Sequence, residues 1–163
     1  MCNEWCASRR ISPSGLAQIN FTDAQYDKIS IPFPREFLGC VSLMQILESV
    51  FSPEMPGSLL WMRDWGIWSE ATEEVGIAFW KKFRPEEGRD SLLEYPGHLL
   101  SEADLESLRA LLLLPIIFQW DAQWFSSNGE SIISIKHDGL LEVMVRGENT
   151  KRIVANIEAY LKR

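Results

Sequence analysis

The neighbouring residues His137 and Asp138 form the pattern in this chain that most resembles catalytic chemistry. An imidazole beside a carboxylate can move protons, and KHDG places Gly139 directly after the two residues. A base also needs a substrate proton or a nucleophile within hydrogen-bond reach, and His98 and Asp121 are the other candidates for such a site. One open hypothesis is therefore a small hydrolase or small-molecule binder that uses His98 with His137 or Asp121.

Turn chemistry gives a second account of the same stretch. A three-residue loop over 137–139 opposes Ile135 to Leu141, and glycine then takes the third position, where a left-handed backbone is favoured. A two-residue turn would instead oppose Ile135 to Glu142 and mix buried with polar positions. Because aspartate often caps backbone amides in turns, we favour a structural role for His137 and Asp138.

The remaining candidates also have ordinary interpretations. His98 follows a Pro-Gly turn and is predicted to lie in a surface loop. Asp121 is predicted to lie on the polar face of a strand, where a carboxylate is solvated. The chain has no phosphate-binding loop, dinucleotide-binding glycine motif, nucleophile elbow or zinc-protease motif. These observations favour a protein without catalytic activity over an enzyme.

The cysteines predict neither disulfides nor a metal site. Cys2, Cys6 and Cys40 are odd in number and lack a framework spacing, which favours free thiols in a cytoplasmic protein. Zinc needs four ligands, and only the two histidines could join these cysteines, so we expect no metal and no other cofactor. The N-terminus has no apolar run of signal-peptide length, and the longest apolar stretch, 111–118, is much shorter than the roughly 20 residues of a membrane span.

Composition limits the possible partners. The 163 residues are 46% hydrophobic, which is enough for one domain with a substantial core, and we expect it to span 19–163 after a loose tail over 1–18. The net charge of −7 argues against non-specific binding to nucleic acid or to anionic membranes. A protein partner, or self-association, remains open.

Periodicity and capping signals predict an α+β fold. Its sheet is expected to be mostly antiparallel, with about four helices packed mainly on one face. Strands are predicted near 26–33 and over 59–68, although the aromatic spacing in 59–68 also fits a helix. Helices are predicted over 37–51, 69–84, from about 102 to the neighbourhood of Pro115, and from 149 or 150 to the C-terminus. The first helix is predicted to bury Phe37, Val41, Met44, Leu47 and Phe51.

A three-strand meander is predicted over about 120–126, 131–136 and 140–146. A turn at Asn128-Gly129 pairs Trp124 with Ile133 and Ala122 with Ile135. One face then collects apolar side chains for the C-terminal helix to cover: Trp120, Ala122, Trp124, Ile133, Ile135, Leu141, Val143 and Val145. On the opposite face Phe125, Ile132 and Met144 line up. Either other parts of the fold cover these three, or they form an exposed partner-binding patch with a polar rim.

Four short segments resemble a set of small bacterial proteins of uncharacterised activity. They are WGIW (65–68), YPGHLL (95–100), WDA (120–122) and HDG (137–139), and the resemblance covers roughly residues 58 to 146. The chain departs from that pattern at Gln119, Lys136 and Gly139. The resemblance implies a bacterial, single-domain protein and no particular activity. Taken together, the sequence favours a non-catalytic protein-binding module, of the immunity or adaptor type.

Overall fold

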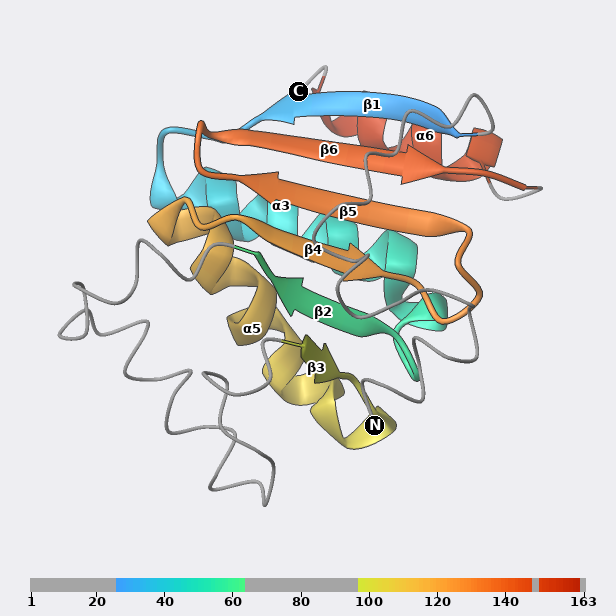
Figure 1. Ribbon diagram of the computed structural model, residues 1–163. Helices are drawn as coiled ribbons and strands as arrows, with labels where there is room; N and C mark the ends of the chain where they lie inside the picture. Colours follow the sequence, from blue (N-terminus) through green and yellow to red (C-terminus); the bar gives the residue numbers. More distant parts are fainter. Residues whose placement is uncertain (1–25, 64–96, 148–149, 162–163) are drawn as a thin grey trace, which may run out of the picture.

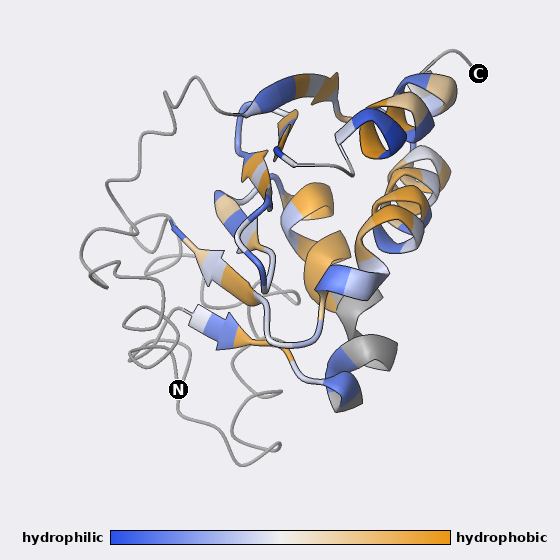
Figure 2. Ribbon diagram, turned by 90° about the vertical axis from the view of Figure 1, so that its right-hand side faces the viewer, coloured by the Kyte–Doolittle hydropathy of each residue, from blue (hydrophilic) through white to orange (hydrophobic). Residues whose placement is uncertain are grey.

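The structure, a computed structural model, describes residues 26–63, 97–147 and 150–161. Within these ranges the chain has an α+β fold, in which a six-stranded antiparallel sheet carries three α-helices on one face (Figures 1 and 2). The strands are β1 (Asp27–Pro32), β2 (Leu59–Met62), β3 (Gly97–Leu99), β4 (Ala122–Phe125), β5 (Ser131–Lys136) and β6 (Leu140–Val145). Their order across the sheet is β1-β6-β5-β4-β2-β3.

The helices are α3 (Phe37–Phe51), α5 (Leu105–Phe118) and α6 (Thr150–Leu161), with short 3-10 turns at Ser52–Glu54 and Glu102–Asp104. None of these described helices is long and apolar enough to cross a membrane. The fourth predicted helix, 69–84, the tail over 1–18, and residues 64–68 of the predicted strand 59–68 lie outside the described residues. Residues 59–62 form a strand, as predicted.

Both predicted hairpin registers are confirmed. Trp124 pairs with Ile133, and Ile135 pairs with Leu141 across a loop over 137–139. Gly139 has a φ of 81°, the left-handed conformation that this loop position requires. Strand β4 is shorter than predicted. The three strands of the meander lie inside the sheet, because β1 pairs with β6 on one side and β2 pairs with β4 on the other.

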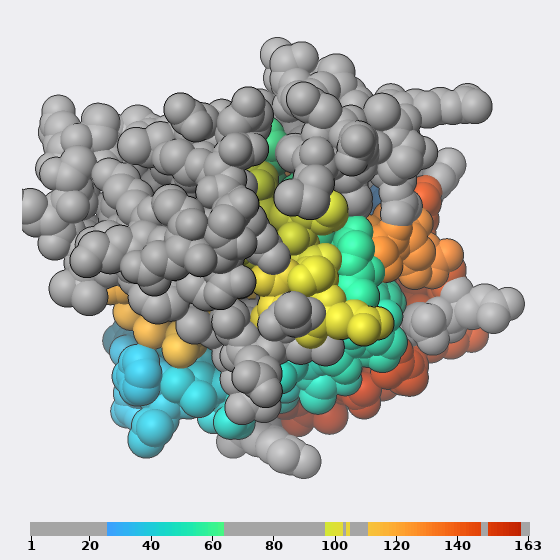
Figure 3. Space-filling view, turned by 90° about the horizontal axis from the view of Figure 1, so that it is seen from below, coloured from blue at the N-terminus to red at the C-terminus, as the bar shows by residue number. Residues whose placement is uncertain are grey.

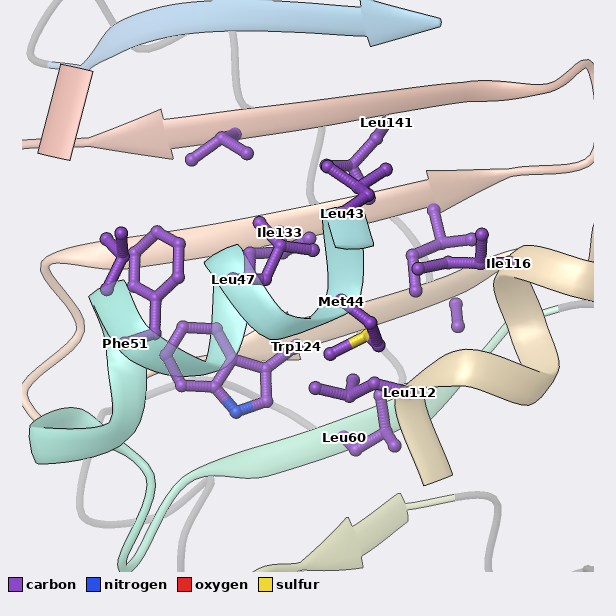
Figure 4. Close-up of a cluster of buried hydrophobic side chains, with 14 of the residues drawn as sticks. Leu43, Met44, Leu47, Phe51, Leu60, Leu112, Ile116, Trp124, Ile133 and Leu141 are labelled. Carbon is purple, nitrogen blue, oxygen red and sulfur yellow. The ribbon is translucent and has the colours of Figure 1, made fainter. Parts of the chain in front are cut away.

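The helix-facing side of the sheet forms the main core. All eight residues of the predicted apolar face belong to one buried cluster with side chains from α3, α5 and α6. Figure 4 shows how Leu47 and Phe51 of α3 and Leu112 of α5 point toward the sheet around Trp124. The C-terminal helix α6 covers part of this face, as predicted, together with the other two described helices, α3 and α5.

The buried face of α3 differs from the prediction. Its buried residues are Cys40, Leu43, Met44, Leu47, Val50 and Phe51, while Phe37 is 61% exposed and Val41 is only partly buried. A close contact at the start of the helix accounts for the difference. A Cβ atom on Gly39 would lie 2.5 Å from Cβ of Pro34, so the first turn packs directly on that proline. This packing turns Cys40 inward and leaves Phe37 at the surface.

A 3-10 turn over Glu102–Asp104 leads into helix α5, whose N-cap residue Asp104 makes no side-chain capping hydrogen bond to the helix. The Asp104 carboxylate accepts hydrogen bonds from the backbone N–H and the hydroxyl of Ser101, both at 2.6 Å. The helix then continues through Pro115 to Phe118, three residues beyond the predicted end. It stops at Gln119, whose φ of 54° is left-handed and whose backbone N–H donates to the carbonyl of Pro115.

Candidate functional site

Asp121 and His137 form a contact pair at one end of the sheet. An Asp121 carboxylate oxygen accepts a hydrogen bond from the backbone N–H of His137 at 2.8 Å. The carboxylate oxygens also lie 3.1 and 3.0 Å from Nδ1 of the His137 ring. When Asp121 is ionised it places the ring proton on Nδ1, the tautomer of a base that acts through Nε2. The same carboxylate, however, accepts the backbone hydrogen bond of the 137–139 turn, and this structural role is enough to explain why Asp121 lies there.

Asp121 was predicted to be a solvated residue within a strand, and the structure differs in both respects. Asp121 precedes β4, and its side chain is 26% exposed because it folds against the 137–139 loop. His137 lies in that loop, as predicted, with a side chain that is 62% exposed. Asp138 is exposed in the same turn.

His98 is not a loop histidine, and the prediction of a surface position was wrong. It lies in β3 opposite Leu60, and its side chain is completely buried on the helix-covered face. Its Nε2 lies 3.6 Å from a carboxylate oxygen of Asp104, an electrostatic contact longer than a good hydrogen bond. Strands β2 and β4 separate β3 from β5, so His98 does not join the Asp121–His137 pair. The hypothesised site of His98 with His137 or Asp121 is not assembled.

The row Phe125, Ile132 and Met144 forms as predicted but is not an exposed patch. Phe125 pairs with Ile132 and Ile132 with Met144. Their exposed fractions are only 3%, 2% and 4%, and together with Leu59 they make a second buried cluster. Of the two alternatives for these residues, burial within the fold is the correct one, since apolar side chains on this face are removed from water. The structure therefore offers no open surface at this row.

A pocket of about 470 Å³ lies at the same end of the sheet as the Asp121–His137 pair. Its apolar walls come from Phe33, Pro34, Phe37, Ile116 and Ile117, and its other lining residues are Arg35, Cys40, Gln119 and Gly139. These residues belong to the β1–α3 connection with the start of α3, the end of α5, and the β5–β6 turn, which lie together at the left of Figure 1. The fold thus brings three separate parts of the sequence into one site.

Two of the side chains that line this pocket are apolar and exposed, and each is followed in the sequence by another exposed apolar residue. Among the described residues, the exposed large hydrophobic side chains are Phe37, Leu38, Ile117 and Phe118, at 61%, 74%, 37% and 38%. Phe37 and Ile117 line the pocket, and Leu38 and Phe118 follow them in the sequence. Figure 3 shows the start of α3 in cyan beside the light-orange end of α5 at the lower left. We call the pocket with these four side chains the pocket surface.

The polar groups of the pocket carry positive or no charge. Arg35 is exposed and forms no ion pair within the described part of the chain, and no lining residue is acidic. Burial raises the pKa of the Cys40 thiol more than its backbone hydrogen bond lowers it, so the thiol is neutral at pH 7. Its Sγ lies 3.4 Å from the carbonyl oxygen of Pro34, and it is not in a disulfide.

The structure also bears on metal binding. Within the described ranges, His, Cys, Asp and Glu side chains do not gather in any group of three or more that could hold a metal ion. Cys2 and Cys6 lie outside those ranges. The Asp121–His137 pair supplies two potential ligands, and a zinc site needs more.

Sequence reasoning missed the pocket surface. Phe37 and Ile117 belong to apolar runs that look like core helix, and nothing local marks them as exposed. The available signal was the Pro34–Gly39 spacing, because a glycine in a first helical turn often permits close packing.

Comparisons with known proteins add no relative. No family model, no curated protein and no solved structure matches the chain.

Proposed function

We propose that this chain is a non-catalytic protein-binding module whose partner docks on the pocket surface. The observation that carries the proposal is a pocket lined by the exposed side chains of Phe37 and Ile117, with the exposed residues Leu38 and Phe118 directly after them in the sequence. Fully burying an exposed large apolar side chain contributes roughly 1.5–3 kcal/mol. Phe37 and Leu38 have most of that gain still available, and Ile117 and Phe118 only about a third of it, so Phe37 and Leu38 are expected to contribute most at the centre of an interface.

The surroundings of the pocket support a protein partner. An apolar centre with polar neighbours is the composition of a protein interface, and Arg35 and Gln119 supply hydrogen-bond donors at its edge. The exposed apolar residues lie at the ends of two helices, whose backbone is already folded, so less conformational freedom is lost on binding than with an unfolded segment. The proposed surface replaces the buried row of Phe125, Ile132 and Met144.

The catalytic alternative has less support. It required His98 to act with His137 or Asp121, and His98 is buried next to Asp104 on the helix-covered face instead. Asp121 is engaged with the backbone of the 137–139 loop. A structural account therefore covers each of these residues without a reaction.

The test compares two exposed positions on the same helix. Leu38→Lys places a charge in the proposed interface, and Gln45→Lys, the control, introduces the same lysine at an exposed position outside the pocket lining. Proteins captured by the full chain from an extract of its source cell are purified and titrated against all three forms by calorimetry. We expect Leu38→Lys to weaken binding at least about 10-fold and Gln45→Lys to change it less than about 2-fold.

The free energy of unfolding of each variant is expected to lie within about 0.5 kcal/mol of the wild-type value, since both positions are exposed. Equal affinities of Leu38→Lys, Gln45→Lys and wild type for the purified partner would rule out the pocket surface as the interface.

A further inference from the structure

We infer that the pocket receives an acidic–apolar segment of the partner, in which an apolar side chain enters the pocket while a neighbouring carboxylate pairs with Arg35. The inference rests on the proposed function and names the chemistry of the partner. It depends on three features of the pocket: the volume, the sign of the charge, and the exposed apolar rim.

The volume suits one side chain with its flanking backbone. A pocket of about 470 Å³ is within the range of small-ligand sites in proteins, which is about 300–1,000 Å³. Its walls from Phe33, Ile116 and Ile117 are apolar, and the buried Cys40 beside them carries no charge at pH 7. A leucine- or phenylalanine-sized side chain is therefore the group that gains most by entering.

The charge selects an anion beside that side chain. The chain as a whole has a net charge of −7, yet the lining contains one cation, Arg35, and no acid. Arg35 makes no ion pair with the described residues, and an arginine can bind a carboxylate through two parallel hydrogen bonds. Its neighbour Glu36 is not part of the lining.

The exposed rim favours a protein segment over a free small acid. Leu38 and Phe118 are exposed and do not line the pocket, so a small ligand inside the pocket would leave them in water. A polypeptide segment that anchors one side chain in the pocket can cover both.

The experiment uses two peptides that differ only in charge. Acetyl-Gly-Leu-Asp-Gly-amide and acetyl-Gly-Leu-Asn-Gly-amide are titrated into the full-length ¹⁵N-labelled chain and followed by amide chemical shifts. We expect a Kd on the order of 1 mM for the aspartate peptide, since it is short and flexible. The asparagine peptide is expected to bind about five-fold more weakly. The shifted amides should belong to residues 33–40, 116–119 and 139.

Arg35→Gln is the decisive variant. Arg35→Gln should lower the affinity for the aspartate peptide to that for the asparagine peptide, and it should leave the affinity for the asparagine peptide unchanged. Arg152→Gln on the exposed part of α6 is the matched control and should preserve the preference. A merely structural role of Arg35 would weaken both peptides alike.

Three outcomes overturn the inference. They are equal affinity of the two peptides for wild type, shifts confined to other residues or absent up to the solubility limit, and binding of isovalerate as tight as that of the aspartate peptide, which would indicate a site for small acids. The proposed function is judged separately. If Leu38→Lys still weakens binding to the purified partner, only the inferred chemistry of the bound segment is wrong. If Leu38→Lys leaves that affinity unchanged, the pocket surface is not the interface.

Discussion

Asp121 illustrates how one side chain can look catalytic and hold a turn. Its carboxylate binds both the backbone N–H and the ring of His137, so the three-residue loop is tied to the residue that precedes β4. Histidine next to aspartate in KHDG suggested a pair of sequence neighbours, yet the partner of His137 is Asp121. A contact across 16 positions follows from the β4–β5 register, which places the two residues at the same end of the sheet.

Replacing Asp121 by alanine should loosen the turn. The N–H of His137 loses its acceptor, and loss of one such hydrogen bond costs about 1 kcal/mol. Urea unfolding should show that decrease, and amide exchange of His137 should become faster. Asp138→Ala in the same turn is the control, expected to change stability by less than about 0.5 kcal/mol because its side chain is exposed. Equal effects of the two substitutions would contradict a clamping role for Asp121.

At the scale of elements, local chemistry predicted the hairpins and failed where distant segments meet. The pairs Trp124–Ile133 and Ile135–Leu141 follow from turn residues and alternation, which are properties of neighbouring residues. The burial of His98 depends on the pairing of β3 with β2, in which His98 lies opposite Leu60, 38 positions earlier in the sequence, and no local pattern encodes it. The pocket depends likewise on three separate segments, so only its individual residues were visible in the sequence.

The orientation of α3 is the clearest case of a tertiary contact overriding periodicity. Spacing predicted Phe37 in the buried stripe, but the contact between Gly39 and Pro34 turns that side chain outward. Because Phe37 lines the pocket, the same contact contributes to the candidate site. One glycine thus connects the packing of an element with the proposed function.

Gly39→Ala tests this contact by the sign of its effect. In a helix, glycine to alanine ordinarily stabilises by up to about 1 kcal/mol. Here the new Cβ would lie 2.5 Å from Cβ of Pro34, so we expect a loss of about 1–3 kcal/mol in urea unfolding. In a Pro34→Gly background the obstacle is gone, and Gly39→Ala should become neutral or stabilising. A stabilising effect in both backgrounds would show that the first turn can move away without cost.

At the scale of the whole molecule, an ion-pair group joins three neighbouring strands. Glu142 of β6 lies 2.6 Å from Nζ of Lys28 on β1 and 2.8 Å from Nζ of Lys136 on β5. The Glu142 side chain is only 12% exposed, while both lysines are partly exposed. Burial alone would raise the pKa of Glu142, but the hydrogen bonds and charges of Lys136 and Lys28 outweigh it and lower that pKa.

The lowered pKa gives the stability of the fold a defined pH dependence. A carboxyl group whose pKa is lower in the folded chain contributes stability that is fully present above its unfolded pKa, here about 4.5, and is lost as the pH falls through the folded pKa. Wild type should therefore lose free energy of unfolding between about pH 5 and pH 3, measured by urea unfolding. Glu142→Gln removes the titrating group, so its loss over that range should be smaller than that of wild type. Glu158→Gln, at an exposed position of α6, is the control and should follow the wild-type profile. If the profiles of Glu142→Gln and Glu158→Gln run parallel, the two lysines do not stabilise the ionised form of Glu142 in the folded chain.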